Sequence, residues 1–278
     1  MPGNIRVGNV DIVAVLDMVP PPREPSMMFP TTSSQDWESH QDALEEGQLQ
    51  LYYLHFFLRS QGKTIMVDTG MGPGPHPDRG NRTGDLINQL KIKGVDTGDV
   101  DIVAHTHLHG DHVGWNIDNT DSQPAPTFPK ARYLVPRLDW EHFTQPDVIG
   151  TAPQVTNSVI PLQGMGLMDL VDSEHNITDE VKTLSTPGHT PGHMVIVITS
   201  QGEKAMVVGD LLHNKAQVER PDWTAGVDTD KDSSRRNREN ILDQAEEEGY
   251  VIAAGHFHPN DHIGKVVRLE GKRFWQIL

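Results

Sequence analysis

Apolar and polar residues alternate in short runs along most of the chain, and Gly, Pro or Asp ends most of these runs. This period of two is typical of β-strands with one buried face. Runs on either side of Gln61-Gly62 predict a hairpin, and runs on either side of Glu270-Gly271 predict another near the end of the sequence. The other expected strands lie at 10–15, 100–105, 131–135, 181–185, 194–199, 205–209 and 250–255.

Fewer segments have the spacing of an amphipathic helix. This spacing is present at Leu86, Ile87 and Leu90, which predict a helix that ends at Gly94. The segment 235–249 predicts a longer helix, and shorter helices are expected around Trp140 and over 37–46. The remainder of 119–176 is expected to be irregular. Five prolines break regular structure over 19–30, a segment that carries the apolar triplet Met27-Met28-Phe29.

Two β-rich halves with helices attached to each favour an α/β fold in one domain, 1–278, because no linker divides the chain. The expected architecture is a four-layer αββα sandwich. Strand order is not readable from the pattern, so this expectation depends on the family resemblance described below. The Pro-rich region, about 18–47, is expected to form a flap over the site or a dimer element.

Composition narrows the possible partners. The net charge of −16 disfavours nucleic acid and anionic membranes. The absence of cysteine excludes disulfides and thiolate chemistry. The sequence shows neither a signal-peptide pattern nor a run of about 18 apolar residues, so a cytoplasmic location is expected. The 15 histidines are an unusually high number, and histidine is the commonest metal ligand.

The densest chemical signal is the segment His-Thr-His-Leu-His-Gly-Asp-His at 105–112. It directly follows a predicted strand, so several imidazoles and one carboxylate lie close together. Neutral imidazole and carboxylate suit zinc and similar divalent ions. His189, Asp210 and His256 also come just after predicted strands, where a sheet edge brings side chains to a common point. Seven ligands divide naturally between two ions that share a bridging carboxylate.

These motifs resemble those of the metallo-β-lactamase-fold hydrolase superfamily. His107-Leu-His109-Gly-Asp111-His112 matches the family motif His-X-His-X-Asp-His, and the other elements follow in order over about 50–260. The resemblance implies that His107, His109 and His189 hold one ion. It implies that Asp111, His112 and His256 hold the second, and that Asp210 bridges the two. The ions are expected to be zinc, with manganese, cobalt or iron as alternatives.

Within the superfamily, Thr-Pro-Gly-His-Thr-Pro-Gly-His at 186–193 resembles the N-acyl homoserine lactonases and the methyl parathion hydrolase group. The resemblance implies a homodimer and a small-molecule ester, lactone or phosphotriester as substrate. It departs from the lactonases at His213, where many of them have a leaving-group tyrosine. Classical β-lactamases lack an aspartate in the role of Asp210, so that activity is disfavoured.

The expected mechanism is hydrolysis by a hydroxide generated on two ions about 3.5–4 Å apart. Asp210 organises the ions, and Asp111 or His213 protonates the leaving group. Three functions remain open: a lactonase or carboxylesterase, a phosphotriesterase-like or β-lactamase hydrolase, and a non-hydrolytic metal-binding or redox protein. Redox members of the fold usually need a fused flavin domain, which disfavours the third.

Several neighbouring residues have two interpretations. Asp68 is expected to accept a hydrogen bond from a ligating histidine, or else to cap a turn. His193 is interpreted as a loop-stabilising residue or a contact to substrate or metal, and His105 as a core residue rather than a metal ligand. His258 and His262 are interpreted as surface-loop residues. Residues 27–29 and Trp115 are candidates for an apolar substrate pocket, with a dimer contact as the alternative for the triplet.

Overall fold

The structure, a computed structural model, describes residues 4–119 and 123–278. In these ranges the strands form a seven-stranded sheet, a six-stranded sheet and a small two-stranded ladder. The first sheet has the order β1 (Asn4–Val7), β2 (Val10–Met18), β3 (Tyr53–Ser60), β4 (Lys63–Val67), β5 (Ile102–Ala104), β8 (Arg132–Pro136) and β9 (Met168–Val171). The second has the order β10 (Val181–Ser185), β11 (Met194–Ser200), β12 (Glu203–Val207), β13 (Val251–Ala253), β14 (Ile263–Leu269) and β15 (Lys272–Ile277). The ladder pairs β6 (Ile117–Asp118) with β7 (Ala125–Pro126).

Both sheets are mixed. In the first, β1 to β4 pair antiparallel and β4, β5, β8 and β9 pair parallel. In the second, β12 and β13 are parallel and every other pair is antiparallel. Parallel pairs bring the carboxyl ends of their strands to one edge of the sheet, where the connecting loops carry side chains toward a common site.

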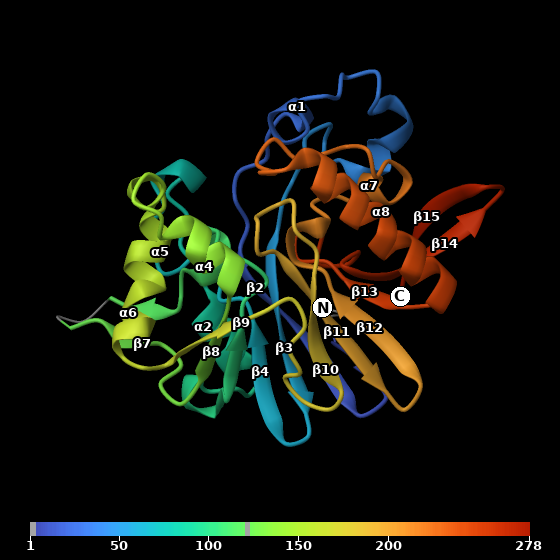
Figure 1. Ribbon diagram of the computed structural model, residues 1–278. Helices are drawn as coiled ribbons and strands as arrows, with labels where there is room; N and C mark the ends of the chain where they lie inside the picture. The colour runs from blue at the N-terminus through green and yellow to red at the C-terminus, as the bar shows by residue number, and fades with distance from the viewer. Residues whose placement is uncertain (1–3, 120–122) are drawn as a thin grey trace.

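The α-helices are short except for the last. They are α1 (Pro25–Met28), α2 (Leu86–Ile92), α3 (Gly110–Val113), α4 (Arg137–Phe143), α5 (Pro153–Ser158), α6 (Ile160–Gly164), α7 (Ala216–Glu219) and α8 (Lys231–Glu248). Short 3₁₀ segments occupy Glu38–Ala43, Pro77–Arg79, Thr97–Asp99, Ile149–Thr151 and Gly209–Leu211, and the first of them is kinked at His40. In Figure 1 the sheets lie in the middle, with α2, α4, α5 and α6 on one side and α8 on the other.

Alternate side chains of each strand pack into different hydrophobic cores, one on each face of the sheet. Ile12 and Ala14 of β2 enter the core between the two sheets, whereas Val13 and Val15 join the core beneath α2. In the same way Ile196 of β11 faces the first sheet, and Val195 packs in the core beneath α8. Successive side chains of a strand point to opposite faces, so each sheet buries both of its faces. The predicted α/β fold with two sheets flanked by helices is confirmed.

The hairpins at Gln61-Gly62 and Glu270-Gly271 are confirmed, and both turns have positive φ at both residues. Other expectations were wrong. The segment expected as a helix over 37–46 contains only the 3₁₀ turn Glu38–Ala43. The region 119–176, expected to be mostly irregular, also contains α5, α6 and β9. Strand β9 has only four residues, and the first three are partly buried to a similar degree, so it gives no clear alternation.

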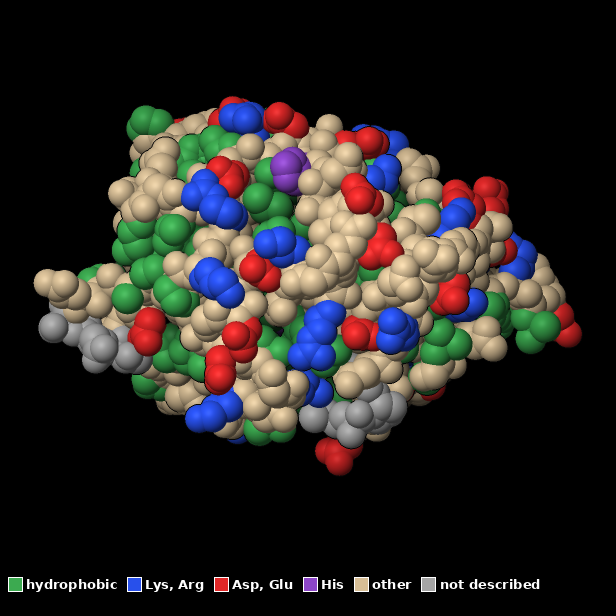
Figure 2. All heavy atoms as spheres, turned by 90° about the horizontal axis from the view of Figure 1, so that it is seen from below, with side chains coloured by type: hydrophobic (Ala, Val, Ile, Leu, Met, Phe, Trp, Pro, Cys, Tyr) green, Lys and Arg blue, Asp and Glu red, His purple; other side chains and the backbone are tan. Residues whose placement is uncertain are grey.

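Charged side chains of both signs are interspersed over the face shown in Figure 2, and histidine is almost absent from it. The acidic excess therefore forms no single patch on this face. Most of the histidines are instead buried inside the molecule. Within the described ranges, no helix combines the length and the apolar composition needed to cross a bilayer.

Candidate metal centre

The seven residues that the sequence suggested as ligands lie together where strands of both sheets end. His107 and His109 lie in the loop after β5, and Asp111 and His112 lie in α3, which follows that loop. From the second sheet, His189 follows β10, Asp210 follows β12 and His256 follows β13. The loops at this edge thus bring residues far apart in the sequence to one point between the halves of the molecule.

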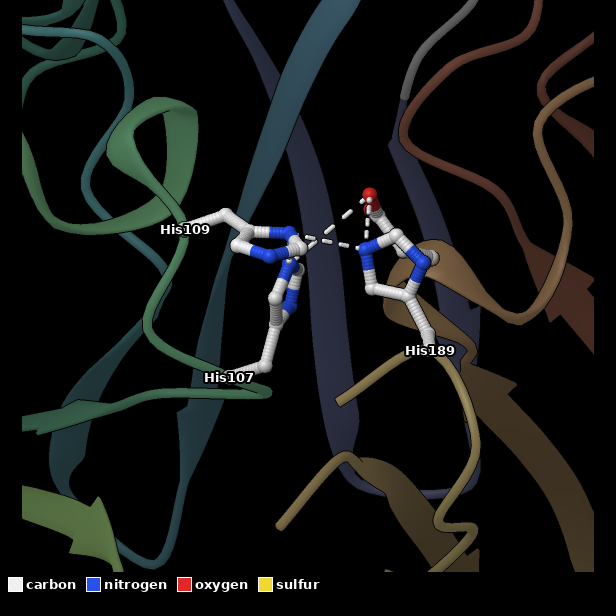
Figure 3. Close-up of side chains that lie close together, drawn as sticks. His107, His109 and His189 are labelled. Carbon is white, nitrogen blue, oxygen red and sulfur yellow. Dashed lines mark hydrogen bonds and ion pairs between the residues drawn. The ribbon is translucent and has the colours of Figure 1, made fainter. Parts of the chain in front are cut away.

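His107, His109 and His189 form the first group, shown in Figure 3 with their ring nitrogens turned toward one another. His109 Nδ1 lies 3.1 Å from His107 Nε2 and 2.9 Å from His189 Nε2. Metal–nitrogen bonds of about 2.0–2.1 Å in a tetrahedral site separate neighbouring ligand atoms by about 3.3 Å. The observed spacing is close to that of a tetrahedral metal site.

Asp111, His112 and His256 form the second group, and their ligand-type atoms also lie within 4.8 Å of one another. His112 Nε2 is 3.9 Å from Asp111 Oδ1. His112 and His256 are buried, whereas Asp111 keeps some exposure. Asp111 is therefore the most accessible member of the second group.

Asp210 lies between the two groups. Its Oδ1 is 3.0 Å from both His112 Nε2 and His256 Nε2. Its Oδ2 is 3.1 Å from His189 Nε2 and 3.7 Å from His107 Nε2. Each oxygen thus faces a different group, which is the arrangement that a carboxylate needs in order to bridge two ions.

The outer nitrogen of four of these histidines is hydrogen-bonded to an oxygen. His112 Nδ1 donates to Asp68 at 2.8 Å, and His189 Nδ1 to Asp228 at 2.9 Å. His256 Nδ1 donates to the Tyr52 carbonyl at 2.9 Å. The Thr106 hydroxyl, which donates to Asp68, accepts from His107 Nδ1 at 3.0 Å. These bonds leave the inner Nε2 lone pairs free to bind a cation.

Electrostatics also favour a cation here. Burial lowers the pKa of His107 well below its usual value and that of His109 to about 3, so both imidazoles are neutral at neutral pH. Burial also opposes the charging of His189, but Asp210 and Asp228 outweigh it and raise its pKa to about 9. The carboxylates therefore hold positive charge at the centre, and a bound divalent ion would replace such protons.

Asp68 is confirmed as the hydrogen-bond acceptor of a histidine in the motif. It also accepts from the Thr106 backbone at 2.7 Å, which ties the end of β4 to the motif loop. His193 has the loop-stabilising role: its Nε2 accepts the backbone N–H of Asp210 at 3.1 Å, and its Nδ1 donates to Thr186. His105 is buried as expected and lies 3.7 Å from Asp68.

His213 lies beside the bridge, with Nε2 3.2 Å from Asp210 Oδ2 and its ring stacked on His256 at 5.4 Å. Burial lowers its pKa. The interpretation of His262 as a surface residue was wrong, since it is 2% exposed and its Nδ1 donates to the Pro259 carbonyl. It packs against Phe56 of β3.

Two buried aspartates at the centre were missed in the sequence. Asp139 accepts from the backbone N–H groups of Leu108 and Gly192 and from the Thr190 hydroxyl, so it joins the two histidine-bearing loops. Its position just after a predicted strand was an available signal. Asp228 is one of four aspartates between 222 and 232, and nothing in the sequence distinguishes it from the other three.

A cavity of about 430 Å³ opens directly onto the centre. The residues that line it are Arg23, Met28, Leu51, Tyr53, Met71, Asp78, Arg79, His109, Gly110, Asp111, Pro153, Gln154, His189, Asp210, His213, Val227 and His256. The pocket prediction is confirmed for Met28. It was wrong for Phe29, which packs against Trp37 and Trp223, and for Trp115, whose Nε1 donates to Asp17. The cavity therefore combines the polar centre with a partly apolar wall.

Asp228→Asn is expected to weaken metal binding by about 10- to 100-fold, since the amide holds the His189 ring less firmly and makes its Nε2 less basic. Metal affinity measured by competition with a chromophoric chelator checks this. Asp147→Asn is the matched control, because Asp147 is exposed and outside the centre. Unchanged affinity in Asp228→Asn, in a folded protein, would remove the orienting role of this carboxylate.

Comparison with known proteins gives one family match along the chain. A family model described as the metallo-beta-lactamase superfamily matches residues 55–256. N-acyl homoserine lactonase of Bacillus thuringiensis is 24% identical over 238 residues, which cover 80% of this chain and 88% of that protein. N-acyl homoserine lactonase AttM of Rhizobium radiobacter is 26% identical over 126 residues, and this match covers only 44% of either protein.

Solved structures match over nearly the whole chain. The hydrolase AbOPH of the beta lactamase superfamily superposes with a TM-score of 0.85 at 23% identity, over 99% of this chain and 97% of that one. The dizinc quorum-quenching lactonase AidC, solved with a homoserine product, superposes with a TM-score of 0.81 at 21% identity, over 99% and 96%. At these identities the likeness establishes the fold.

Proposed function

The chain belongs to the metallo-β-lactamase superfamily, and from that premise we propose that it is a dinuclear metal-dependent hydrolase of lactones or carboxylic esters. The observation that carries the proposal is the position of Asp210, with one carboxylate oxygen toward each histidine group. The similarity to N-acyl homoserine lactonases supports the choice of a lactone or ester. A homodimer is expected from the resemblance to their group.

We assign His107, His109 and His189 to one ion, Asp111, His112 and His256 to the other, and Asp210 to both. The donor set of imidazole nitrogens and carboxylate oxygens suits zinc, with manganese, cobalt or iron as alternatives, whereas magnesium prefers an all-oxygen shell. When bound, two such ions supply Lewis acidity and an activated water.

Residues of the chain orient the ligands, transfer protons and contact the substrate in the proposed reaction. Asp68, Asp228 and the Tyr52 carbonyl hold the imidazoles in the orientation that keeps their inner lone pairs free. Asp111 and His213 line the cavity beside Asp210. Either side chain could accept the proton that the attacking water loses and pass it to the leaving oxygen. Met28, Leu51 and Met71 form an apolar wall against which the acyl part of a substrate can pack.

A hydrolysis panel of lactones, aryl carboxylic esters, phosphotriesters and β-lactams tests the proposal on zinc-loaded protein. We expect lactones and carboxylic esters to be the best substrates. A clear preference for phosphotriesters or β-lactams would overturn the substrate class, and the absence of hydrolysis throughout the panel would overturn the enzymatic assignment.

His213→Ala is expected to lower kcat/KM more for alkyl esters than for nitrophenyl esters, because an alkoxide needs a proton as the bond breaks and a nitrophenolate does not. We expect the fold-loss of kcat/KM for the alkyl ester to exceed that for the nitrophenyl ester by about 10- to 100-fold. Matched alkyl and nitrophenyl esters, measured at equal metal content, check this. If both substrates lose rate equally, His213 only positions Asp210, and Asp111 becomes the proton donor to test.

A further inference from the structure

Two arginines line the cavity at the metal centre, although the chain has a net charge of −16. The guanidinium of Arg23 makes neither a hydrogen bond nor an ion pair with any residue in 4–119 or 123–278. Acidic side chains are plentiful elsewhere, and several arginines on the surface are paired with them. An arginine with unused N–H donors beside such a cavity is suited to binding an anion.

Arg79 uses only part of its hydrogen-bonding capacity. Its Nε donates to the Tyr53 hydroxyl at 2.9 Å, and its Nη1 donates to the Asp78 carboxylate at 2.6 Å. Its Nη2 has no partner within the described ranges, and the side chain keeps 28% of its surface exposed. The guanidinium therefore retains free N–H donors for a group that enters the cavity.

Tyr53 connects Arg79 to the metal centre. Its ring meets the ring of His256 edge-on at 5.5 Å between centroids, and its hydroxyl accepts the bond from Arg79. Burial, with the nearby Asp111, raises the pKa of Tyr53, so the hydroxyl stays neutral. Tyr53 therefore contacts both Arg79 and His256, and all three residues line the same cavity.

The loop that carries Arg79 is anchored at both ends by Asp17. The carboxylate of Asp17 accepts from the backbone N–H of Met71 at 2.7 Å and from those of Asp85 and Leu86 at 3.0 Å. These bonds join the loop to the end of β2. Because the loop is fixed, Arg79 is held in place before substrate arrives, which reduces the entropy lost on binding.

We propose that Arg79, assisted by Arg23, binds an oxyanion of the substrate, so the preferred substrates are esters or lactones that carry a carboxylate or phosphate group within the same cavity. This inference rests on the proposed hydrolase function and narrows its substrate class. The acidic residues of the cavity do not prevent an oxyanion from binding there. Asp78 is already paired with Arg79, and Asp111 and Asp210 belong to the proposed metal ligands.

The test compares matched aryl esters on zinc-loaded protein: the monoester of a dicarboxylic acid, its methyl-capped neutral partner and the corresponding phosphono acid ester. We expect the wild type to prefer an anionic ester over the neutral one by about 10- to 100-fold in kcat/KM, the range of a charge-assisted hydrogen bond. The carboxylate and phosphono arms show which oxyanion is preferred.

Arg79→Gln is expected to reduce this preference by about tenfold or more, mainly through KM, and Arg23→Gln to reduce it less. Arg82→Gln is the matched control, since Arg82 is exposed on the same loop and does not line the cavity. Equal rates of the wild type on charged and neutral esters, or an unchanged preference in Arg79→Gln, would overturn the inference.

Binding of the uncleavable amide of the anionic acid separates this inference from the proposed function. We expect calorimetry to show about tenfold weaker binding to Arg79→Gln than to wild type, and equal binding would overturn the oxyanion site. If no ester is cleaved but the amide still binds more weakly to Arg79→Gln than to wild type, the hydrolase assignment fails and the oxyanion site stands.

Discussion

Replacement of Asp210 by asparagine is expected to lower kcat/KM on the best substrate by at least about a hundredfold, the scale for loss of one electrostatic stabiliser. The amide keeps the shape of the side chain but removes the negative charge that faces both histidine groups. It also leaves an NH₂ group facing one of them, where a donor repels a cation. We therefore expect loss of one metal ion as well as loss of rate.

Initial rates, metal content and thermal unfolding of the Asp210→Asn protein check this expectation. Asp147→Asn, at an exposed position, is the control for the same chemical change. A folded Asp210→Asn protein with two metal ions and a rate close to wild type would show that this carboxylate is not the bridge.

Removal of metal by prolonged dialysis against a strong chelator is expected to lower the hydrolysis rate by about a thousandfold or more. Among the described residues, the cavity lining includes no serine, threonine, cysteine or lysine that could serve as another nucleophile. Metal removal should also lower stability. A ligand present at 100 times its dissociation constant stabilises the folded state by about 2.7 kcal/mol, and the melting temperature should fall accordingly. Rates and melting curves before and after dialysis check both effects. Retention of the full rate in demonstrably metal-free protein would contradict the account.

The clustering of the candidate metal ligands was predictable from the sequence because its signal is local. Four ligand-type residues between His107 and His112 follow one strand, and His189, Asp210 and His256 each follow another. Strand ends are recognisable from alternation and from the Gly or Pro that follows. The structure places all of these residues at one edge, as the pattern indicated.

The partners of those ligands were harder to predict. Asp228 reaches His189 across 39 residues, and the fold alone decides which of several neighbouring aspartates does so. Arg79 belongs to a Gly/Pro loop without periodicity, and its position at the cavity depends on contacts between distant residues: Asp17 anchors the loop, and Tyr53 accepts a hydrogen bond from the guanidinium. Short helices such as α5 and α6 were missed because six or fewer residues give too little pattern.

Titration of the metal-free protein with zinc, with bound metal and the hydrolysis rate followed together, tests the central claim most directly. If Asp210 bridges two ions, binding saturates at about two equivalents per chain, and full activity returns only as the second equivalent is bound. Saturation at one equivalent with full activity would contradict the dinuclear centre. A folded protein that binds no zinc would contradict the metal centre altogether.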